Sequence, residues 1–318
     1  MPITLNEAKE LSQSKLTNFV IDEFRKSPLM DALVFDNTVK SQGGTTLAYV
    51  YNRVTTQPTA SGRSLNNEYV AQETKTTAHT VNLKPFGGSF QLDRVIINDE
   101  KQVVDHIQFQ MEQKIKATRA YFEDTFVNGD SGVDATEFDG LDKAITGSST
   151  EKTPAAAIDL STSANITTNF NLFMDTLDAW LATLDGTPDA IMMNRVLHAI
   201  MSGIARRSGY FSTSDVDAFG KPVTKYQGIP LMPLGDKPGT SNPIVSIDGV
   251  TGETSIYAAR ISLDGVHGVA PEGNDLVKRY MPDMSRPGAV KTGEVEMVAA
   301  MALKATRAAG VLRRVKVA

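Results

Sequence analysis

Apolar side chains recur every three, four or seven residues between positions 100 and 127. This spacing places them along one face of an α-helix. The members of that face are Val103, Val104, Ile107, Met111, Ile115, Phe122 and Phe126. Asn128 and Gly129 follow directly and are typical of a helix C-terminus. The pattern therefore predicts one helix over residues 100–127, about 42 Å long, which is long enough to act as a structural spine.

Three shorter helices are predicted by the same periodicity. Residues 5–26 begin with the capping-box pair Thr4 and Glu7, and the Ser27-Pro28 step ends that helix. Residues 169–184 and 195–206 form the other two. The inward side chains of the 169–184 helix are Phe170, Phe173, Leu177, Trp180, Leu181 and Leu184.

Between residues 41 and 86 the pattern changes to the partial alternation that is typical of strands. A run rich in Thr, Tyr and Val at 45–51 is followed by a polar loop tip at 57–67 and by a second strand-like run at 68–83. The sequence thus predicts a long β-hairpin with little core of its own. Because an isolated hairpin is marginal in water, we expect this one to need a partner surface.

Further strands are predicted at residues 88–97, 189–193, 255–263 and 290–317. The segment 226–233 is typical of a turn into an edge strand, because Pro230 and Pro233 lack the backbone N–H groups that a central strand donates to its neighbours. No internal repeat is visible. Helices and strands together predict an α+β fold.

Composition narrows the class of protein. The chain has 318 residues, of which 41% are hydrophobic and 22% charged, so it is an ordinary globular sequence. A net charge of −5 argues against a basic nucleic-acid-binding protein. The absence of cysteine excludes disulfides, thiolate metal sites and cysteine nucleophiles, and it fits a reducing compartment. Neither a membrane span nor a signal peptide is visible, so we expect a cytosolic address.

The charges are unevenly distributed. Residues 129–189 carry 11 acids against Lys143 and Lys152, whereas residues 301–318 carry five bases and no acid. These five are Lys304, Arg307, Arg313, Arg314 and Lys316. Two interpretations are open for the two segments: they are solvated surface, or they join neighbouring subunits through opposite charges. A third role for the bases is contact with DNA.

No constellation of catalytic, cofactor-binding or metal-binding residues emerges from the sequence. The histidines His79, His106, His198 and His267 are scattered and are interpreted as structural. Asp130 and Asp134 hint at a calcium loop, but Ala135 stands where the turn glycine belongs. Nucleophile-elbow, phosphate-loop and dinucleotide motifs are absent. The sequence therefore favours a structural or assembly protein over an enzyme.

Four stretches, in this order, resemble the major capsid protein of tailed double-stranded-DNA bacteriophages, which has the Hong-Kong-ninety-seven-type fold. Residues 27–33 are similar to the end of the family's N-terminal arm, and residues 41–86 to its extended loop. The helix ending at 126–130, with residues 137–141 after it, is similar to the spine helix and its following turn. Residues 225–233 resemble the turn of the axial domain.

The resemblance implies a domain organisation and a function. It places an N-terminal arm at 1–40, an extended loop at 41–86, a peripheral domain at 87–153 and 271–318, and an axial domain at 154–270. The subunit would self-assemble into hexamers and pentamers of an icosahedral shell that encloses double-stranded DNA. It would belong to the virion and assemble in the cytoplasm of the host bacterium.

The resemblance also bears on partners. Because only residues 1–40 precede the hairpin, a separate scaffolding protein is expected, together with a portal and with decoration proteins as a further option. Packaged DNA would be contacted weakly and without sequence preference. Lys75 and Lys84 are candidates for covalent cross-linking in the hairpin, with no partner asparagine fixed. Two alternatives stay open: an encapsulin-type nanocompartment shell, and a soluble enzyme with an unrecognised site.

Overall fold

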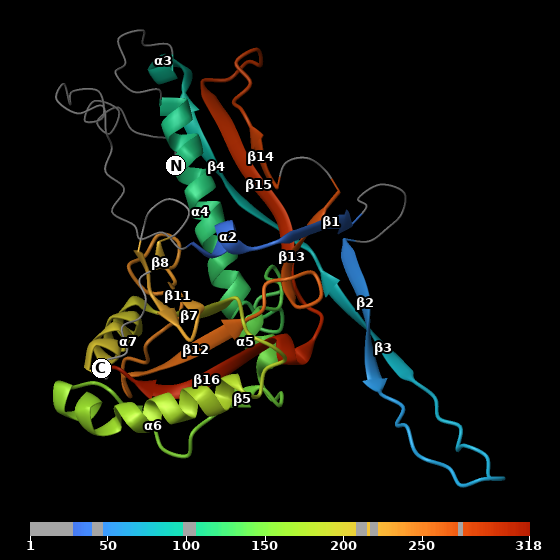
Figure 1. Ribbon diagram of the computed structural model, residues 1–318. Helices are drawn as coiled ribbons and strands as arrows, with labels where there is room; N and C mark the ends of the chain where they lie inside the picture. The colour runs from blue at the N-terminus through green and yellow to red at the C-terminus, as the bar shows by residue number, and fades with distance from the viewer. Residues whose placement is uncertain (1–27, 40–46, 98–105, 208–214, 217–221, 273–275) are drawn as a thin grey trace.

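The computed structural model describes residues 28–39, 47–97, 106–207, 215–216, 222–272 and 276–318. The helix expected at 5–26 and the first positions of the helix expected at 100–127 lie outside these residues. The described chain forms two large β-sheets, each with its own helices, one hairpin that projects away from both, and a small two-stranded sheet (Figure 1). No described helix is long and apolar enough to cross a membrane.

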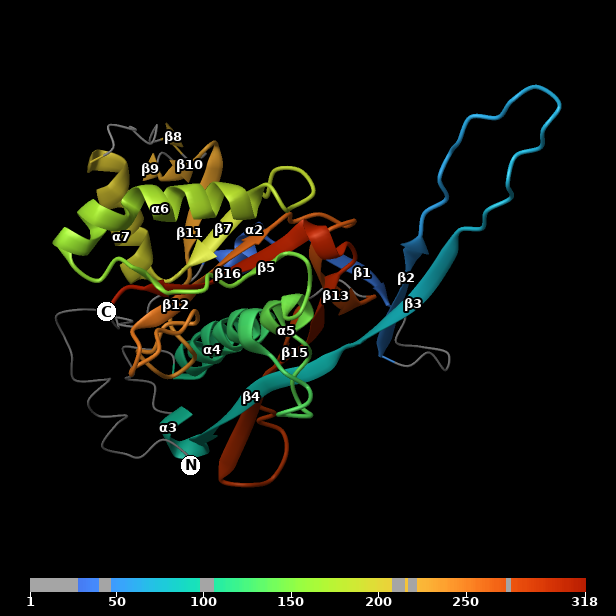
Figure 2. The same cartoon turned by 90° about the horizontal axis from the view of Figure 1, so that it is seen from below.

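The first sheet has five strands and is built around one long strand. β15 (Val290–Leu303) pairs along ten positions with β4 (Lys84–Asp93) and, at its other end, with β13 (Val266–Pro271). β1 (Phe35–Val39) adds to β13 in parallel, and β14 (Val277–Tyr280) pairs with β15. The spine helix α4 (His106–Asn128) lies along β4 and β15 (Figures 1 and 2). The sequence prediction of a long helix in this region is confirmed.

The predicted face of the spine helix points into the core. Met111 and Phe122 are buried, while Ile107 and Ile115 are partly buried against β4 and β15 residues. Phe122 is the centre of an aromatic cluster. Its ring centroid lies 5.6 to 6.1 Å from four other rings: Phe35, Phe86, Phe126 and Phe138. These rings come from β1, β4, α4 and the segment before α5 (Leu141–Ile145), so one side chain ties distant parts of the chain together.

The spine helix is followed by Gly129, at a position where the surrounding backbone leaves no space for a side chain. A Cβ on Gly129 would lie 2.3 Å from the carbonyl oxygen of Phe138 and 2.5 Å from that of Thr125. Such a close backbone approach leaves no room for any other residue. The Gly140 amide donates to the Gly129 carbonyl at 2.8 Å, which brings the 129–140 loop back against the helix.

Strand β4 ends earlier than the alternation at 88–97 predicts. Residues Arg94–Ile97 form a short helix, α3. The Asp93 carboxylate accepts a hydrogen bond from the Val95 amide at 2.8 Å. This side-chain contact satisfies an amide at the start of a helix and so favours helix over strand, despite the β-branched residues that follow. The strand prediction is therefore wrong for residues 94–97.

The second sheet has seven strands, which run in the order β10-β11-β7-β12-β16-β5, with β6 also pairing with β16. Their bounds are β5 (Glu151–Lys152), β6 (Ile158–Asp159), β7 (Ala190–Met193), β10 (Lys225–Tyr226), β11 (Ile229–Pro233), β12 (Glu253–Ala259) and β16 (Ala309–Lys316). Helices α6 (Ser163–Leu181) and α7 (Arg195–Arg207) pack against one face. A separate two-stranded sheet joins β8 (Asp215–Val216) and β9 (Pro222–Val223).

Both faces of the seven-stranded sheet are buried, which explains the continuous apolar run in β7. Ile191 and Met193 face the core under α6 and α7, whereas Met192 faces the core shared with the spine helix. Successive side chains of a strand point to opposite faces, so a strand covered on both sides is apolar at every position. Trp180 of α6 is fully buried, and its indole Nε1 donates to the Thr150 carbonyl at 3.0 Å.

Two details of this half differ from the sequence predictions. Helix α6 begins at Ser163 rather than at 169, because the Thr162 hydroxyl caps it by accepting from the Asn165 amide at 3.1 Å. β11 is not an edge strand: it pairs with β7 on one side and with the two-residue strand β10 on the other. Its prolines are compatible with this position because β10 is so short that few ladder donors are required of β11.

Strand pairing divides the chain differently from the expected domain ranges. The C-terminal strand β16 lies inside the seven-stranded sheet, between β12 and β5, although residues 271–318 were expected with the spine helix. β13, whose residues fall mostly in the expected 154–270 range, pairs with β15 in the five-stranded sheet. The last two long strands, β15 and β16, thus connect the two sheets directly through the short turn η1 (Thr306–Ala308).

Candidate assembly surfaces

The most exposed part of the described chain is the predicted hairpin. We call residues 48–82 the arm; this segment is distinct from the N-terminal arm expected at 1–40. β2 (Ala48–Thr56) and β3 (Lys75–Asn82) pair antiparallel from Ala48 with Asn82 to Thr56 with Lys75. Residues 57–74 connect them as an extended loop that reaches far beyond both sheets (Figures 1 and 2). The hairpin prediction is confirmed, although the second strand begins at 75 rather than at 68.

One face of β2 fixes the root of the arm to the five-stranded sheet. Tyr49, Tyr51 and Arg53 alternate along the strand and therefore point to the same side. The Tyr49 hydroxyl donates to Asp36 Oδ2 and the Tyr51 hydroxyl to the Leu303 carbonyl, both at 2.7 Å. Arg53 Nε donates to the Lys304 carbonyl at 2.8 Å. The alternation at 49, 51 and 53 was the sequence signal for this anchor, but the sequence alone did not identify its acceptors.

The root also encloses a buried histidine. His267 is fully buried, and its ring meets Tyr49 edge to face at a centroid distance of 5.8 Å. Burial, together with the nearby Lys304 charge, lowers the pKa of His267, and the opposing effect of Asp36 does not compensate. Burial on its own raises the pKa of Asp36, but hydrogen bonds from Tyr49 and Thr38 outweigh it and lower that pKa. The root therefore holds a neutral imidazole beside a carboxylate and an ammonium group.

We expect the fold to lose stability in mild acid because of His267. An imidazole whose pKa is lower in the folded chain favours folding above its ordinary pKa of 6.5, and this contribution is lost as the pH falls below that value. The melting temperature of the wild type should therefore fall more steeply than that of His267→Gln between about pH 7.5 and 5. His198, whose pKa burial also lowers, contributes equally to both proteins. Parallel melting curves would contradict this role for His267.

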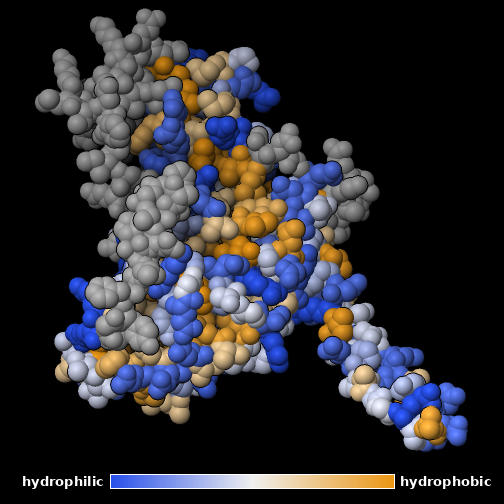
Figure 3. Space-filling view, viewed as in Figure 1, coloured by the Kyte–Doolittle hydropathy of each residue, from blue (hydrophilic) through white to orange (hydrophobic). Residues whose placement is uncertain are grey.

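The tip of the arm carries apolar side chains that the described residues leave largely uncovered. Leu65 is 91% exposed, Tyr69 64% and Val70 81%. Arg63 lies over the Tyr69 ring at 5.4 Å but leaves most of it accessible. Figure 3 shows the arm as a mostly hydrophilic extension with a small apolar patch at its far end. Apolar side chains left exposed at the end of an extended arm make this tip a candidate interaction surface.

Two of the five C-terminal bases, Arg313 and Arg314, have partners within their own chain, whereas Arg307 is exposed. Arg313 pairs with Glu151 and lies 2.9 Å from Asp142, while Arg314 donates to the carbonyls of Pro154 and Ala155. Burial alone lowers the pKa of Arg313, but Glu151 and Asp142 outweigh it and raise that pKa. The basic end thus meets the acidic segment within one chain, through Arg313 with Asp142 and Glu151.

The remaining chemical candidates do not combine into a site. Of the two carboxylates of the candidate calcium loop, Asp130 is paired with Lys143 at 2.6 Å, and Asp134 accepts a hydrogen bond from the Thr136 amide at 2.8 Å. Across the described ranges, no three His, Cys, Asp or Glu side chains are grouped to hold a metal. Lys84 Nζ donates to the Ala135 carbonyl at 2.7 Å. Cross-linking through Lys75 or Lys84 stays a prediction.

The arrangement of a long spine helix, two linked sheets and a projecting arm is that of a viral-capsid-type α+β fold. No protein-family model and no curated protein matches the sequence. Solved structures do match: the holo-SrpI encapsulin complex from Synechococcus elongatus is 16% identical, with a TM-score of 0.67 and coverage of 99% of this chain and 97% of that one.

Two further matches come from particles of other kinds. The capsid of a native GTA particle is 11% identical, with a TM-score of 0.62 and coverage of 98% of this chain and 100% of that one. A structure from Gordonia phage Cozz is 13% identical, with a TM-score of 0.60 and coverage of 96% and 91%. These likenesses extend over nearly the whole chain and establish its fold, which is the Hong-Kong-ninety-seven-type capsid fold.

Proposed function

We propose that this chain is the major capsid protein of a tailed bacteriophage, a structural subunit rather than an enzyme. In this role it self-assembles into hexamers and pentamers of an icosahedral shell that encloses double-stranded DNA. The observation that carries the proposal is the arm: its root is hydrogen-bonded to its own sheet, while its apolar tip has no partner within the described chain. A tip held at a fixed position and left uncovered fits a surface that a neighbouring subunit completes.

The proposal includes the expected domain organisation and partners. The five-stranded sheet and spine helix would form the peripheral domain, and the seven-stranded sheet with α6 and α7 the axial domain, now including β16. A separate scaffolding protein and a portal would assist assembly in the bacterial cytoplasm, with decoration proteins on the outside of the virion as a further option. The decisive experiment is negative-stain microscopy of the purified chain. Rings or closed shells support the proposal, whereas a monomer by size-exclusion chromatography supports the alternative of a soluble enzyme.

An encapsulin-type nanocompartment is the second candidate. It is favoured by the match to the Synechococcus elongatus encapsulin, whose TM-score of 0.67 exceeds those of the GTA and Gordonia phage structures. The two candidates differ in what the shell holds. Native particles that protect double-stranded DNA from nuclease support the phage capsid, whereas particles that retain a protein cargo and no genome support the nanocompartment.

We expect isolated subunits to bind duplex DNA weakly and without sequence preference. The net charge is −5, and the C-terminal bases Arg313, Arg314 and Lys316 are already paired with groups of their own chain. Tight non-specific binding requires several accessible Lys or Arg side chains that displace counterions from phosphates. A gel-shift titration at about 150 mM salt should show no complex at micromolar protein. Tight or sequence-selective binding would contradict a container wall.

A further inference from the structure

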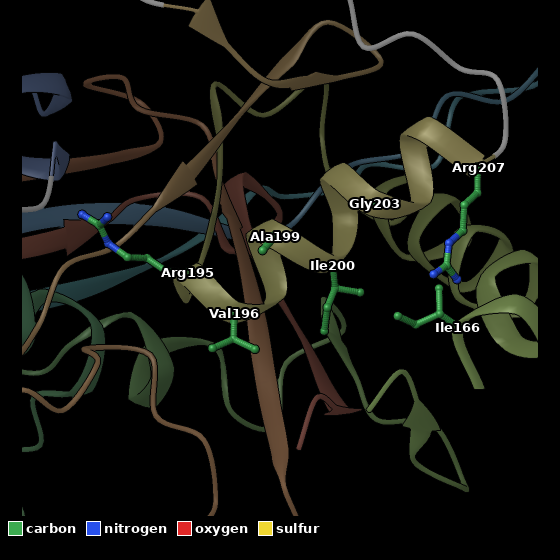
Figure 4. A pocket seen from close by; sticks show the side chains of 7 residues that line it. All are labelled: Ile166, Arg195, Val196, Ala199, Ile200, Gly203 and Arg207. Carbon is green, nitrogen blue, oxygen red and sulfur yellow. The ribbon is translucent and has the colours of Figure 1, made fainter. Parts of the chain in front are cut away.

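Helix α7 is apolar on two sides, although only one side is needed for its own core. Leu197, Met201 and Ile204 are buried beneath the helix. The outer side forms a groove with a volume of about 640 Å³. Its apolar lining comprises Ile166 of α6 and Val196, Ala199, Ile200 and Gly203 of α7 (Figure 4). A surface helix normally has one apolar stripe, so a second one indicates a partner.

An arginine stands at each end of this groove. Arg195 and Arg207 are twelve positions apart on α7, which corresponds to about 18 Å along the helix. Arg207 donates to the oxygens of Ser163 and Thr167. Within the described part of the chain, neither arginine contacts a carboxylate. The groove therefore suits an elongated partner that is apolar in the middle and carries negative charge.

Helix α6 has the complementary surface. Leu172, which is 57% exposed, lies on one stripe with Asp175 and Ala179, because these residues are three and four positions apart. α6 contains two acids and no base. Asp178 accepts hydrogen bonds from Tyr226 and Gln227, but among the described residues Asp175 has no ion-pair partner. With 19 residues, α6 is about 28 Å long and spans the groove.

We propose that the groove on α7 receives the exposed face of α6 from a second copy of this chain. α6 is preferred to α7 as the occupant because α7 carries three arginines and no acid, so two α7 helices would repel each other. The groove is lined mainly by α7 and by Ile166 near the start of α6, whereas the stripe with Leu172 and Asp175 lies further along α6, so the two are different surfaces of one molecule. Their contact is therefore head to tail. Repeated contacts of this kind form a ring where the rotation between copies closes, as the proposed hexamers and pentamers require, and an open filament where it does not. The inference rests on the proposed function and assigns the contact that forms its rings.

Exchange of charges tests the contact. Arg195→Glu and Asp175→Arg each place like charges across the contact and should reduce the yield of rings or shells about tenfold. The double variant restores opposite charges and should recover most of the assembly. Arg195→Lys is the matched control, because it keeps the positive charge at that end of the groove and should leave the yield unchanged. Melting curves of all four variants verify that they fold.

Cysteine trapping gives an independent readout, since the chain contains no cysteine of its own. A variant with both Ala199→Cys and Ala179→Cys, treated with the thiol oxidant diamide, should yield a ladder of covalent multimers. Each single variant should stay monomeric on a denaturing gel. Dimers from Ala199→Cys alone would indicate an α7–α7 contact and overturn the assignment.

The outcomes separate this inference from the proposed function. A wild-type chain that forms no rings or shells overturns both. Wild-type assemblies that tolerate Arg195→Glu and Asp175→Arg, and whose paired cysteines do not cross-link, overturn only the contact between α6 and α7. Loss of assembly in the single charge variants, with recovery in the double variant, supports the contact directly.

Discussion

We expect a chain in which Leu65, Tyr69 and Val70 are all replaced by serine to fold normally but not to form shells. These side chains are between 64% and 91% exposed, so their removal costs the isolated subunit little, within about 0.5 kcal/mol. Burial of each against a neighbour is worth about 1.5–3 kcal/mol, so the triple variant loses roughly 4–9 kcal/mol per contact. At 1.4 kcal/mol per factor of ten, association weakens about a thousandfold or more.

Sedimentation velocity and negative-stain microscopy measure this loss, with circular dichroism to verify the fold. The matched control is Leu65→Met with Tyr69→Phe and Val70→Ile, which keeps the tip apolar and should assemble. Shells from the serine variant at the wild-type yield would show that the tip makes no contact that matters for assembly.

We expect Phe122→Ala to act on folding rather than on assembly, because it should unfold the subunit before assembly begins. The Phe122 side chain is fully buried and lies within 6.1 Å of four other aromatic rings. Truncation of a buried Phe to Ala costs about 3–5 kcal/mol, a large fraction of the 5–15 kcal/mol that stabilises a typical protein. We expect insoluble protein, or a soluble chain with a strongly lowered midpoint of urea unfolding.

Tyr69→Ala is the control for this substitution. It also removes an aromatic side chain, but one that is 64% exposed at the tip of the arm, and it should leave the unfolding midpoint unchanged. A soluble Phe122→Ala protein with the wild-type midpoint would show that the aromatic cluster rearranges to fill the space.

The hydrophobic periodicity correctly predicted those elements that bury one face against the core and expose the other. The three- and four-residue spacing of Met111, Ile115 and Phe122 predicted the buried face of the spine helix, since periodicity reports burial directly. It failed at residues 94–97, where one side-chain contact from Asp93 turns a β-branched run into helix α3. Intrinsic strand preference is weak enough for such a contact to override it.

The pairing of strands that lie far apart in the chain could not be predicted from the sequence. β1 pairs in parallel with β13, which follows it more than two hundred residues later, and no local pattern names that partner. The same holds for Arg53, whose acceptors at Leu303 and Lys304 are about as distant in the chain. The charge pattern indicated that the acidic and basic segments could meet. It did not indicate that Arg313 and Glu151 would pair within one subunit rather than between two.

The position of β16 determines when the seven-stranded sheet can finish folding during synthesis. It follows every other described strand in the chain, yet it lies inside the seven-stranded sheet, with β12 on one side and β5 and β6 on the other. Until the ribosome has passed residue 316, three strands lack their common partner and the α6–α7 layer has an open sheet beneath it. In a subunit that assembles as proposed, the surfaces built on this sheet are therefore complete only after β16 has joined it.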